Sequence, residues 1–315
     1  YNKEGENGSL IEAMYGEKQF KIGSHHWNYP EHSLIQQQTT ITKISGNKIT
    51  IKDPLLMDIR SEWTPKMVEW KHLEEVGIEH LRITFPMAPN IAHHVEEGYN
   101  GIYLTRLFNG WVRDVKIDNA DSGILTEETA NVTIQDIETS GEKIAHYSVS
   151  MSGVHNVLVE NLHVKNKVRH PLSFNTFSTK SVYTNCQVDQ QPLLDQHAGA
   201  NHQNLFDNIT VKIILDEDRS YGLFEGGGAG YWKPSHGSYT TMWNIHVDFQ
   251  NGFESAEPAT LDGMKDGPNA RLIGIHGNLP ITIEYGPNPY QEMTNDEIKE
   301  IPSLYHYQLN KRIKR

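Results

Sequence analysis

A small polar residue recurs along the chain beside short segments in which apolar and polar residues alternate. Asp114, Asp136, Asn161, Asn185 and Asn208 each lie one residue before an apolar-x-apolar pair. The intervals between them are about 22 to 25 residues, a period typical of stacked structural units. The alternation around each of them predicts short β-strands with one buried face.

The recurring residue itself indicates a bend between two strands. Asn and Asp tolerate left-handed backbone angles and hydrogen-bond to neighbouring main chain, so stacked copies would form a buried ladder of polar side chains. The pattern therefore predicts an all-β protein folded as a parallel β-helix, a single-stranded solenoid whose successive turns lie about 4.8 Å apart. A β-sandwich is the alternative, but its turns would not keep Asn or Asp in one phase through five repeats.

The same pattern predicts one elongated domain over residues 1–315, with coils from about residue 40 to about residue 280. The tail at residues 285–315 is rich in Pro, Asn, Glu and Tyr, and we expect it to pack as a cap or along the side. No apolar run is long enough to predict a transmembrane helix. Tyr1 follows neither an initiator Met nor a signal sequence, so we expect a processed or partial form of a longer protein.

Charge limits the classes of partner. The formal net charge is -12 at pH 7, with 17 histidines in addition. Such an acidic chain is expected to bind neither nucleic acid nor anionic membranes, although a locally basic cleft can still accept an acidic polymer. We expect a monomer. The only cysteine, Cys186, is predicted to be a buried thiol without a disulfide partner in the chain.

A second strand is predicted about twelve residues before each bend, which marks the row Ile102, Ile124, Val149, Ser173 and Gln196. Polar residues beside this row are the candidates for chemistry, although each is also of a type that often lies solvated at a surface or packs at the edge of a coil. They come from three successive coils: His146 and Tyr147; Lys165, Lys167, Arg169, His170 and Asn175; and Asp195, Gln196, His197, Asn201 and His202. The glycine-rich segment 226–230 is predicted to be a loop at the edge of a groove, with Tyr231 and Trp232 available to stack on sugar rings.

These residue types suit cleavage of a uronate polymer by β-elimination. The reaction needs a cation or amide near the carboxylate, a base for the C5 proton and an acid for the departing oxygen. Hydrolysis would instead need two carboxylates roughly 5 to 9.5 Å apart, and the inferred phase places no such pair on one outer face. A hydrolase or an epimerase on the same fold and a non-catalytic carbohydrate-binding β-helix are the alternatives.

No metal ligand set is evident in the sequence. The histidine-rich segments 25–26, 93–94 and 197–202 lack the spacing of a known ligand motif. We therefore predict no cofactor and no metal, and no ligand motif supports a Ca²⁺ requirement.

Three segments carry a family resemblance: residues 168–175 (VRHPLSFN), 183–186 (YTNC) and 202–211 (HQNLFDNITV). With them the chain resembles pectate-lyase-like β-helix polysaccharide lyases, and is most similar to the alginate lyases of polysaccharide lyase family thirty-one. The resemblance covers about residues 70–250. It implies a right-handed β-helix and a secreted bacterial enzyme that cleaves mannuronate-rich alginate endolytically. It also implies that Tyr147 is the acid or base and that Lys167 or Arg169 is the carboxylate partner, with Lys165 and His170 as further candidates.

Overall fold

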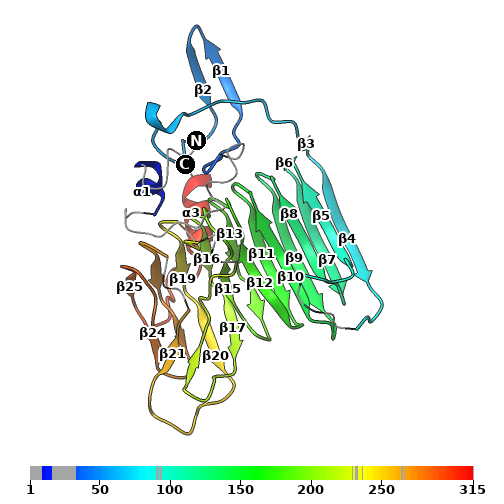
Figure 1. Ribbon diagram of the computed structural model, residues 1–315, viewed down its shortest axis with the longest axis vertical. Helices are drawn as coiled ribbons and strands as arrows, with labels where there is room; N and C mark the ends of the chain where they lie inside the picture. The colour runs from blue at the N-terminus through cyan, green and yellow to red at the C-terminus, as the bar shows by residue number, and fades with distance from the viewer. Residues whose placement is uncertain are drawn as a thin grey trace.

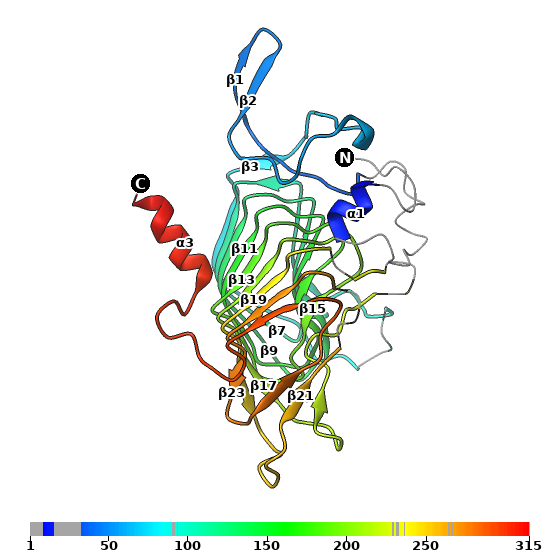
Figure 2. The ribbon, with the colours of Figure 1, turned by 90° about the vertical axis from the view of Figure 1, so that its left-hand side faces the viewer.

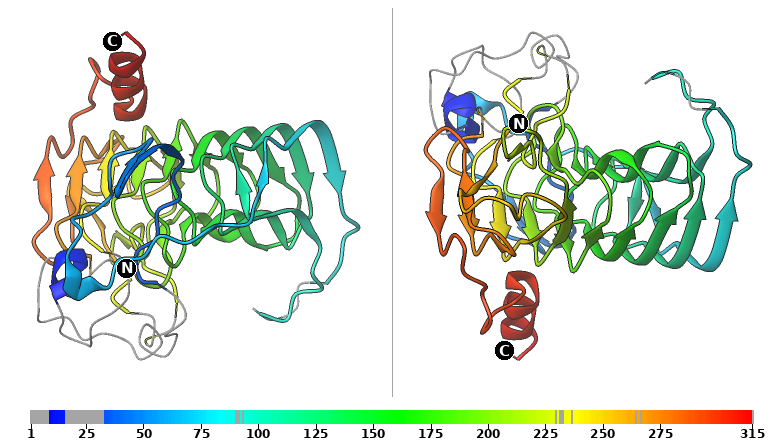
Figure 3. Two further views of the ribbon diagram at one scale, coloured as in Figure 1. Left: turned by 90° about the horizontal axis from the view of Figure 1, so that it is seen from above. Right: turned by 90° about the horizontal axis from the view of Figure 1, so that it is seen from below.

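The structure is a computed structural model that describes residues 9–15, 33–89, 92, 94–228, 230, 233–235, 237–263, 265 and 267–314. Strands dominate it, and two long parallel sheets face each other along the molecule (Figure 3). The predicted all-β class with parallel strands is confirmed. None of the helices in the described part of the chain is long and apolar enough to cross a membrane.

The larger sheet has 13 strands and is called the long sheet below. Its neighbouring strands are parallel throughout. It begins with the long strands β4 (Gly77–Thr84), β7 (Trp111–Asp118), β9 (Thr133–Ser140) and β11 (Leu158–Val164), as Figure 1 shows. It continues as shorter strands: β13 (Val182–Thr184), β14 (Gln187–Val188), β16 (Leu205–Asp207), β17 (Thr210–Ile213), β19 (Thr241–Trp243), β20 (His246–Phe249), β22 (Arg271–Ile273), β23 (His276–Gly277) and β25 (Tyr290–Glu292).

The facing sheet has five parallel strands, in the order β5 (Asn100–Thr105), β8 (Ser122–Glu127), β10 (Ala145–Ser152), β12 (Val168–Phe174) and β15 (Leu194–Gln196). From β5 to β15 the chain alternates between this five-stranded sheet and the long sheet, so that neighbours in one sheet are separated in sequence by a strand of the other. Three further parallel strands form a separate sheet: β18 (Ser220–Tyr221), β21 (Ala259–Leu261) and β24 (Ile281–Ile283).

The remaining elements lie outside these sheets. The antiparallel hairpin β1 (Ile41–Ser45) and β2 (Lys48–Ile51) projects away from the body (Figure 1). Strand β3 (Leu73–Glu74) pairs with β6 (Leu107–Phe108). Within the described residues the helices are α1 (Ser9–Tyr15), the 3-10 helix η1 (Ser61–Trp63) and α3 (Leu304–Ile313).

Aligned apolar side chains fill the space between the sheets. The strand register of the five-stranded sheet lines up the row Ile102, Ile124, Val149, Leu172 and Leu194, all of them buried. The predicted row was wrong by one residue at Ser173 and by two at Gln196, because the distance from this row to the next bend is not a constant twelve residues. Ser173 and Asp195 pair with each other in the adjacent register position.

The recurring Asn and Asp residues lie at bends of the long sheet, as predicted. All five have positive φ, between 51° and 57°. Their side chains bond between repeats: Asn161 Nδ2 donates to Asp136 Oδ1 at 2.9 Å, and Asn208 Nδ2 donates to Asn185 Oδ1 at 2.7 Å. The expectation of a buried ladder was wrong, since Asp114, Asp136 and Asn161 are exposed and Asn185 and Asn208 are only half-buried.

The C-terminal segment lies beside the long sheet (Figure 2). The buried carboxylate of Asp207 on β16 accepts hydrogen bonds from Ser303 Oγ at 2.5 Å and from the backbone N–H groups of Leu304 and Tyr305 at 2.8 and 3.2 Å. Asp207 thus holds the first turn of α3, where unpaired N–H groups favour a negative charge.

Candidate functional site

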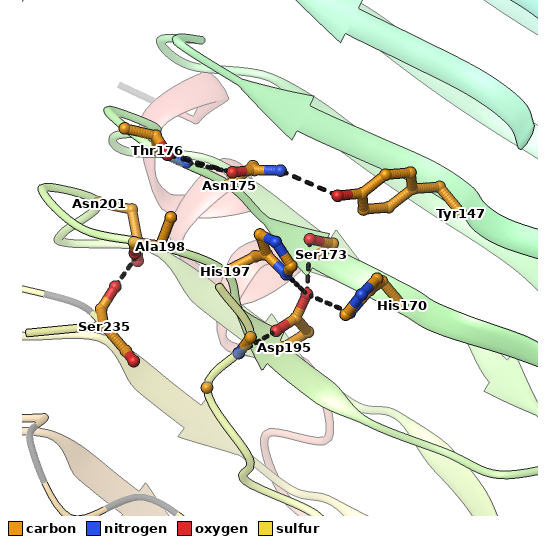
Figure 4. Close-up of polar contacts among 12 residues, drawn as sticks. Tyr147, His170, Ser173, Asn175, Thr176, Asp195, His197, Ala198, Asn201 and Ser235 are labelled. Atoms are coloured by element: carbon orange, nitrogen blue, oxygen red, sulfur yellow. Dashed lines mark hydrogen bonds and ion pairs between the residues drawn. The ribbon is translucent and has the colours of Figure 1, made fainter. Parts of the chain in front are cut away.

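Three neighbouring strands of the five-stranded sheet bring polar side chains together on one face (Figure 4). The register aligns Tyr147 of β10 with His170 of β12, and Ser173 of β12 with Asp195 of β15. His197 follows β15 by one residue. Residues that are 22 to 27 positions apart in sequence thereby become neighbours because successive strands of the sheet are paired in register.

Asp195 is the centre of this arrangement. Its Oδ2 lies 3.1 Å from His170 Nδ1 and 3.2 Å from His197 Nδ1, and accepts a 2.8 Å hydrogen bond from Ser173 Oγ. Its Oδ1 accepts a 3.0 Å bond from the backbone N–H of Gly227. Burial by itself raises the pKa of Asp195, but the two histidines outweigh it and hold this pKa well below its usual range. Asp195 is therefore a buried carboxylate that stays ionised at neutral pH.

Tyr147 lies against the two histidines of the adjacent segments. Its ring stacks on His146 at 4.3 Å between centroids and lies 5.2 Å from His170 and 6.1 Å from His197. Asn175 Nδ2 faces the Tyr147 hydroxyl at 3.3 Å. Burial first, and the charge of Asp195 second, raise the pKa of Tyr147, so the phenol is protonated at neutral pH.

A loop before β5 supplies a second carboxylate. Glu96 Oε1 lies 3.2 Å from His146 Nδ1, and the ring of His94 lies 5.2 Å from that of His146. Asp121 anchors this loop by accepting from the backbone N–H groups of Gly98 and Tyr99 at 2.9 and 2.8 Å.

The carboxylate of Asp121 also explains why a lysine is buried here. Lys143 Nζ contacts Asp121 Oδ1 at 2.6 Å, and the exposed fraction of both side chains is under 5%. The same ammonium lies 4.9 Å from the ring centroid of Tyr99. Lys143 thus neutralises the carboxylate that holds the loop.

The glycine-rich loop covers Asp195 and His197. A Cβ at Gly227 would overlap His197 Nδ1 and come within 3.0 Å of Asp195 Oδ1, so only glycine allows this approach of the backbone. Lys233 Nζ donates to the carbonyl of Gly226 at 3.1 Å. The predicted stacking residues Tyr231 and Trp232 lie outside the described residues.

The predicted cations are not part of this arrangement. Lys165 Nζ contacts Glu138 Oε2 at 2.7 Å across the long sheet. The side chains of Lys167 and Arg169 are exposed, and within the described residues neither forms an ion pair or hydrogen bond with Tyr147 or Asp195. The cluster is accordingly built from imidazoles, a phenol, an amide and the carboxylates of Asp195 and Glu96.

Three other candidates serve packing. Gln196 is fully buried, and its Nε2 donates to the hydroxyl of Tyr285 at 2.9 Å. Asn201 is also buried, and its Nδ2 donates to the carbonyls of Ala198 and Ser235, each at 2.8 Å (Figure 4). Burial lowers the pKa of His202 to about 4 and keeps its imidazole neutral.

The structure thus joins residues that the sequence suggested to Glu96, to which it assigned no role. The suggested residues are Tyr147, His146, His170, Asn175, Asp195 and His197. Spacing gave no signal for Glu96, because it lies in the long loop before β5. The sequence named Asp195 only as one of several polar residues, and its central position becomes visible when Ser173 and His170 are aligned with it.

The site offers donors for a metal ion. Ligand atoms of His170, Asp195 and His197 all lie within 4.8 Å of one another, in a search limited to the described residues. The three residues come from two neighbouring strands and the residue after the second, which is why sequence spacing alone predicted no metal site.

No protein-family model, no curated protein and no solved structure matches the chain at a significant level.

Proposed function

We propose that the chain folds as a right-handed parallel β-helix and acts as a polysaccharide lyase that cleaves a uronate polymer by β-elimination, with alginate as the first candidate. The alternation of the chain between two parallel sheets supports the fold. A protonated phenol surrounded by three imidazoles supports the function, because these groups are suited to proton transfer near neutral pH.

The site lies on the outer face of the five-stranded sheet. Ser173 and Asp195 alternate along their strands with the core residues Leu172 and Leu194, so they belong to the face directed away from the core. The side chains of His170 and His197 beside them are 12% and 15% exposed. In this proposal a sugar chain laid across the strands meets Tyr147, His170 and His197 in order.

Elimination assigns a role to each group. An imidazole, held on one nitrogen by a carboxylate as His146 is by Glu96, takes the C5 proton. The C–H electron pair forms the double bond between C5 and C4, and the bond from C4 to the bridging oxygen breaks. The Tyr147 hydroxyl gives its proton to that oxygen, since its raised pKa keeps it protonated until the leaving group develops charge.

Asn175 fits the carboxylate of the substrate. Its Nδ2 lies 3.3 Å from the Tyr147 hydroxyl, and its Oδ1 is held by the backbone N–H of Thr176 at 2.7 Å. An amide fixed in this way presents a donor toward the negative charge that grows on the carboxylate as the proton leaves. It takes over, in this proposal, the role that the resemblance gave to Lys167 or Arg169.

The test is to incubate the protein with alginate and to follow the ultraviolet absorbance of the unsaturated sugar together with chain shortening. We expect both to rise, and we expect Tyr147→Phe to reduce turnover by about 100-fold or more. Tyr103→Phe is the matched control, because Tyr103 lies on the same sheet and its hydroxyl is bonded to Glu127.

The products separate the alternatives. Shortened chains without unsaturated sugar would identify a hydrolase, and inverted uronate residues in intact chains would identify an epimerase. Tight binding of alginate without any product would favour a carbohydrate-binding protein. Equal turnover in Tyr147→Phe and Tyr103→Phe would remove Tyr147 from the site.

A further inference from the structure

We propose that His170, Asp195 and His197 bind one divalent transition-metal ion, with His170 Nδ1, Asp195 Oδ2 and His197 Nδ1 as its ligands. Two ligands at about 2.0–2.1 Å from a tetrahedral ion are about 3.3 Å apart. The distances from Asp195 Oδ2 to His170 Nδ1 and His197 Nδ1 are 3.1 and 3.2 Å, close to the edge length of such a tetrahedron. Each of the three residues offers one possible ligand atom that lies within 4.8 Å of those of the other two.

The carboxylate is supported as metal ligands usually are. Asp195 accepts bonds from Ser173 Oγ at 2.8 Å and from Gly227 N–H at 3.0 Å, which fix the direction of both oxygens. Asp195 has no exposed surface, and the side chains of His170 and His197 are 12% and 15% exposed. The ligands are therefore held in place before any ion arrives.

The donor set selects the class of ion. Two imidazoles and one carboxylate favour Zn²⁺, Mn²⁺, Fe²⁺ or Co²⁺, whereas Ca²⁺ and Mg²⁺ prefer oxygen ligands alone. Three protein ligands leave at least one coordination position open, as in sites where a metal contacts water or substrate. Zn²⁺ is redox-inert, so it is the ion with which binding at this site is best tested.

A bound ion would also offset the negative charge that the site presents to an acidic substrate, and this step rests on the proposed lyase function. Asp195 and Glu96 would repel a uronate carboxylate, while Lys165 is engaged by Glu138 and the exposed Lys167 and Arg169 do not contact the cluster. A divalent ion on Asp195 balances the two negative charges of Asp195 and Glu96 and places a positive charge at the open position. The open position then suits a carboxylate oxygen of the substrate.

The competing explanation is a metal-free cluster in which both imidazoles donate N–H bonds to Asp195. Binding of Zn²⁺ and Co²⁺ to the full chain distinguishes the two. After purification without chelators and dialysis against Zn²⁺, we expect about one equivalent of bound metal per chain. Replacement by Co²⁺ is expected to give the strong visible absorption of a four- or five-coordinate ion rather than the weak absorption of the hydrated ion.

Variants assign the ligands. Asp195→Asn and His197→Gln are expected to weaken Zn²⁺ binding by at least about 100-fold, and Ser173→Ala by about 10- to 100-fold, since it only supports a ligand. His146→Gln is the matched control, because His146 belongs to the same group of rings without being a proposed ligand, and it should bind Zn²⁺ as the parent does. Circular dichroism checks that each variant is folded.

Two outcomes would overturn the proposal. One is a folded parent protein that takes up no Zn²⁺ and leaves the Co²⁺ spectrum unchanged. The other is Zn²⁺ binding in Asp195→Asn and His197→Gln that is as tight as in the parent. Neither measurement uses a polysaccharide, so metal binding without lyase activity would refute the proposed function alone, and lyase activity in a metal-free protein would refute the metal alone.

Discussion

Polar side chains line up across neighbouring strands in two regions of the molecule whose surroundings are opposite. On the long sheet, Lys165 contacts Glu138 at 2.7 Å and Lys212 contacts Asp189 at 2.8 Å, with the lysines 42% and 38% exposed. On the five-stranded sheet, two imidazoles contact a carboxylate that has no exposed surface. Water screens the first pairs, whereas the buried carboxylate of Asp195 interacts strongly with the two imidazoles, which hold its pKa below the usual range.

The comparison shows that the alignment of polar residues across strands does not by itself indicate function. A repeated strand register aligns polar residues wherever the same position in successive repeats is polar, and on the long sheet this gives exposed ion pairs of balanced sign. Burial is what distinguishes the row at Asp195, since it raises the pKa of Tyr147 and leaves an ionised carboxylate dependent on two histidines. The buried rows should therefore respond to pH and to substitution far more than the exposed ones.

The largest expected difference concerns acid. His155 and His202 form a further buried row, in which burial is the main cause that lowers the pKa of each to about 4. The unfolded chain, with a histidine pKa of about 6.5, then binds more protons between about pH 6.5 and about pH 4, so the free energy of unfolding falls as pH falls through this window. We expect a loss on the order of 3 kcal/mol for each histidine, measured by denaturant unfolding at a series of pH values.

An exposed histidine provides the control for this measurement. His202→Gln removes one buried titrating group and should flatten the pH dependence, whereas His80→Gln, in the exposed row beside Asp114, should leave it as it is. A parent protein equally stable across the window would show that the two buried imidazoles are protonated without cost.

A smaller effect is expected from the glycine loop over Asp195. Gly227→Ala places a methyl group against His197 Nδ1, so the loop must move and the N–H bond to Asp195 is weakened. We expect about 1–3 kcal/mol of destabilisation, as for overpacking elsewhere, together with weaker Zn²⁺ binding. Gly230→Ala is the control, since nothing lies within 4 Å of a Cβ there, and its unfolding and Zn²⁺ binding should match the parent. Equal behaviour of the two variants would show that the loop does not press on the site.

These contrasts also show what the sequence could and could not predict. The Asn and Asp residues from 114 to 208 predicted the parallel strands correctly, because bends with positive φ restrict residue type and recur once in each repeat. The position of a strand twelve residues earlier was less certain, because that segment has no fixed residue type at its ends. Counting back twelve residues from the bend therefore gave Ser173 in place of Leu172 and Gln196 in place of Leu194.

The site was predictable only where its residues lie on regular strands. Tyr147 and His170 followed from their position beside the predicted row, and they do pair in the sheet. Glu96 and Gly227 belong to loops, whose path no periodicity determines. The exposed cations Lys165, Lys167 and Arg169 matched the chemistry expected for a uronate, but residue type alone does not reveal on which face a side chain lies.

The smallest expected effects are those of the exposed cations. Lys165→Ala removes an exposed ion pair with Glu138 and should lower the free energy of unfolding by less than about 1 kcal/mol, because solvent screens such pairs. Arg169→Ala should change it by less than about 0.5 kcal/mol, as for surface residues without specific contacts. Neither substitution is expected to alter turnover on alginate, because neither side chain contacts Tyr147, Asp195 or Asn175 within the described residues.

These two variants distinguish most sharply between two candidates for the group that binds the substrate carboxylate. One is the exposed cation that the family resemblance implies, and the other is the buried row. A large loss of turnover in Arg169→Ala with unchanged stability would assign the carboxylate to the guanidinium and would make the proposed ion at Asp195 unnecessary for catalysis.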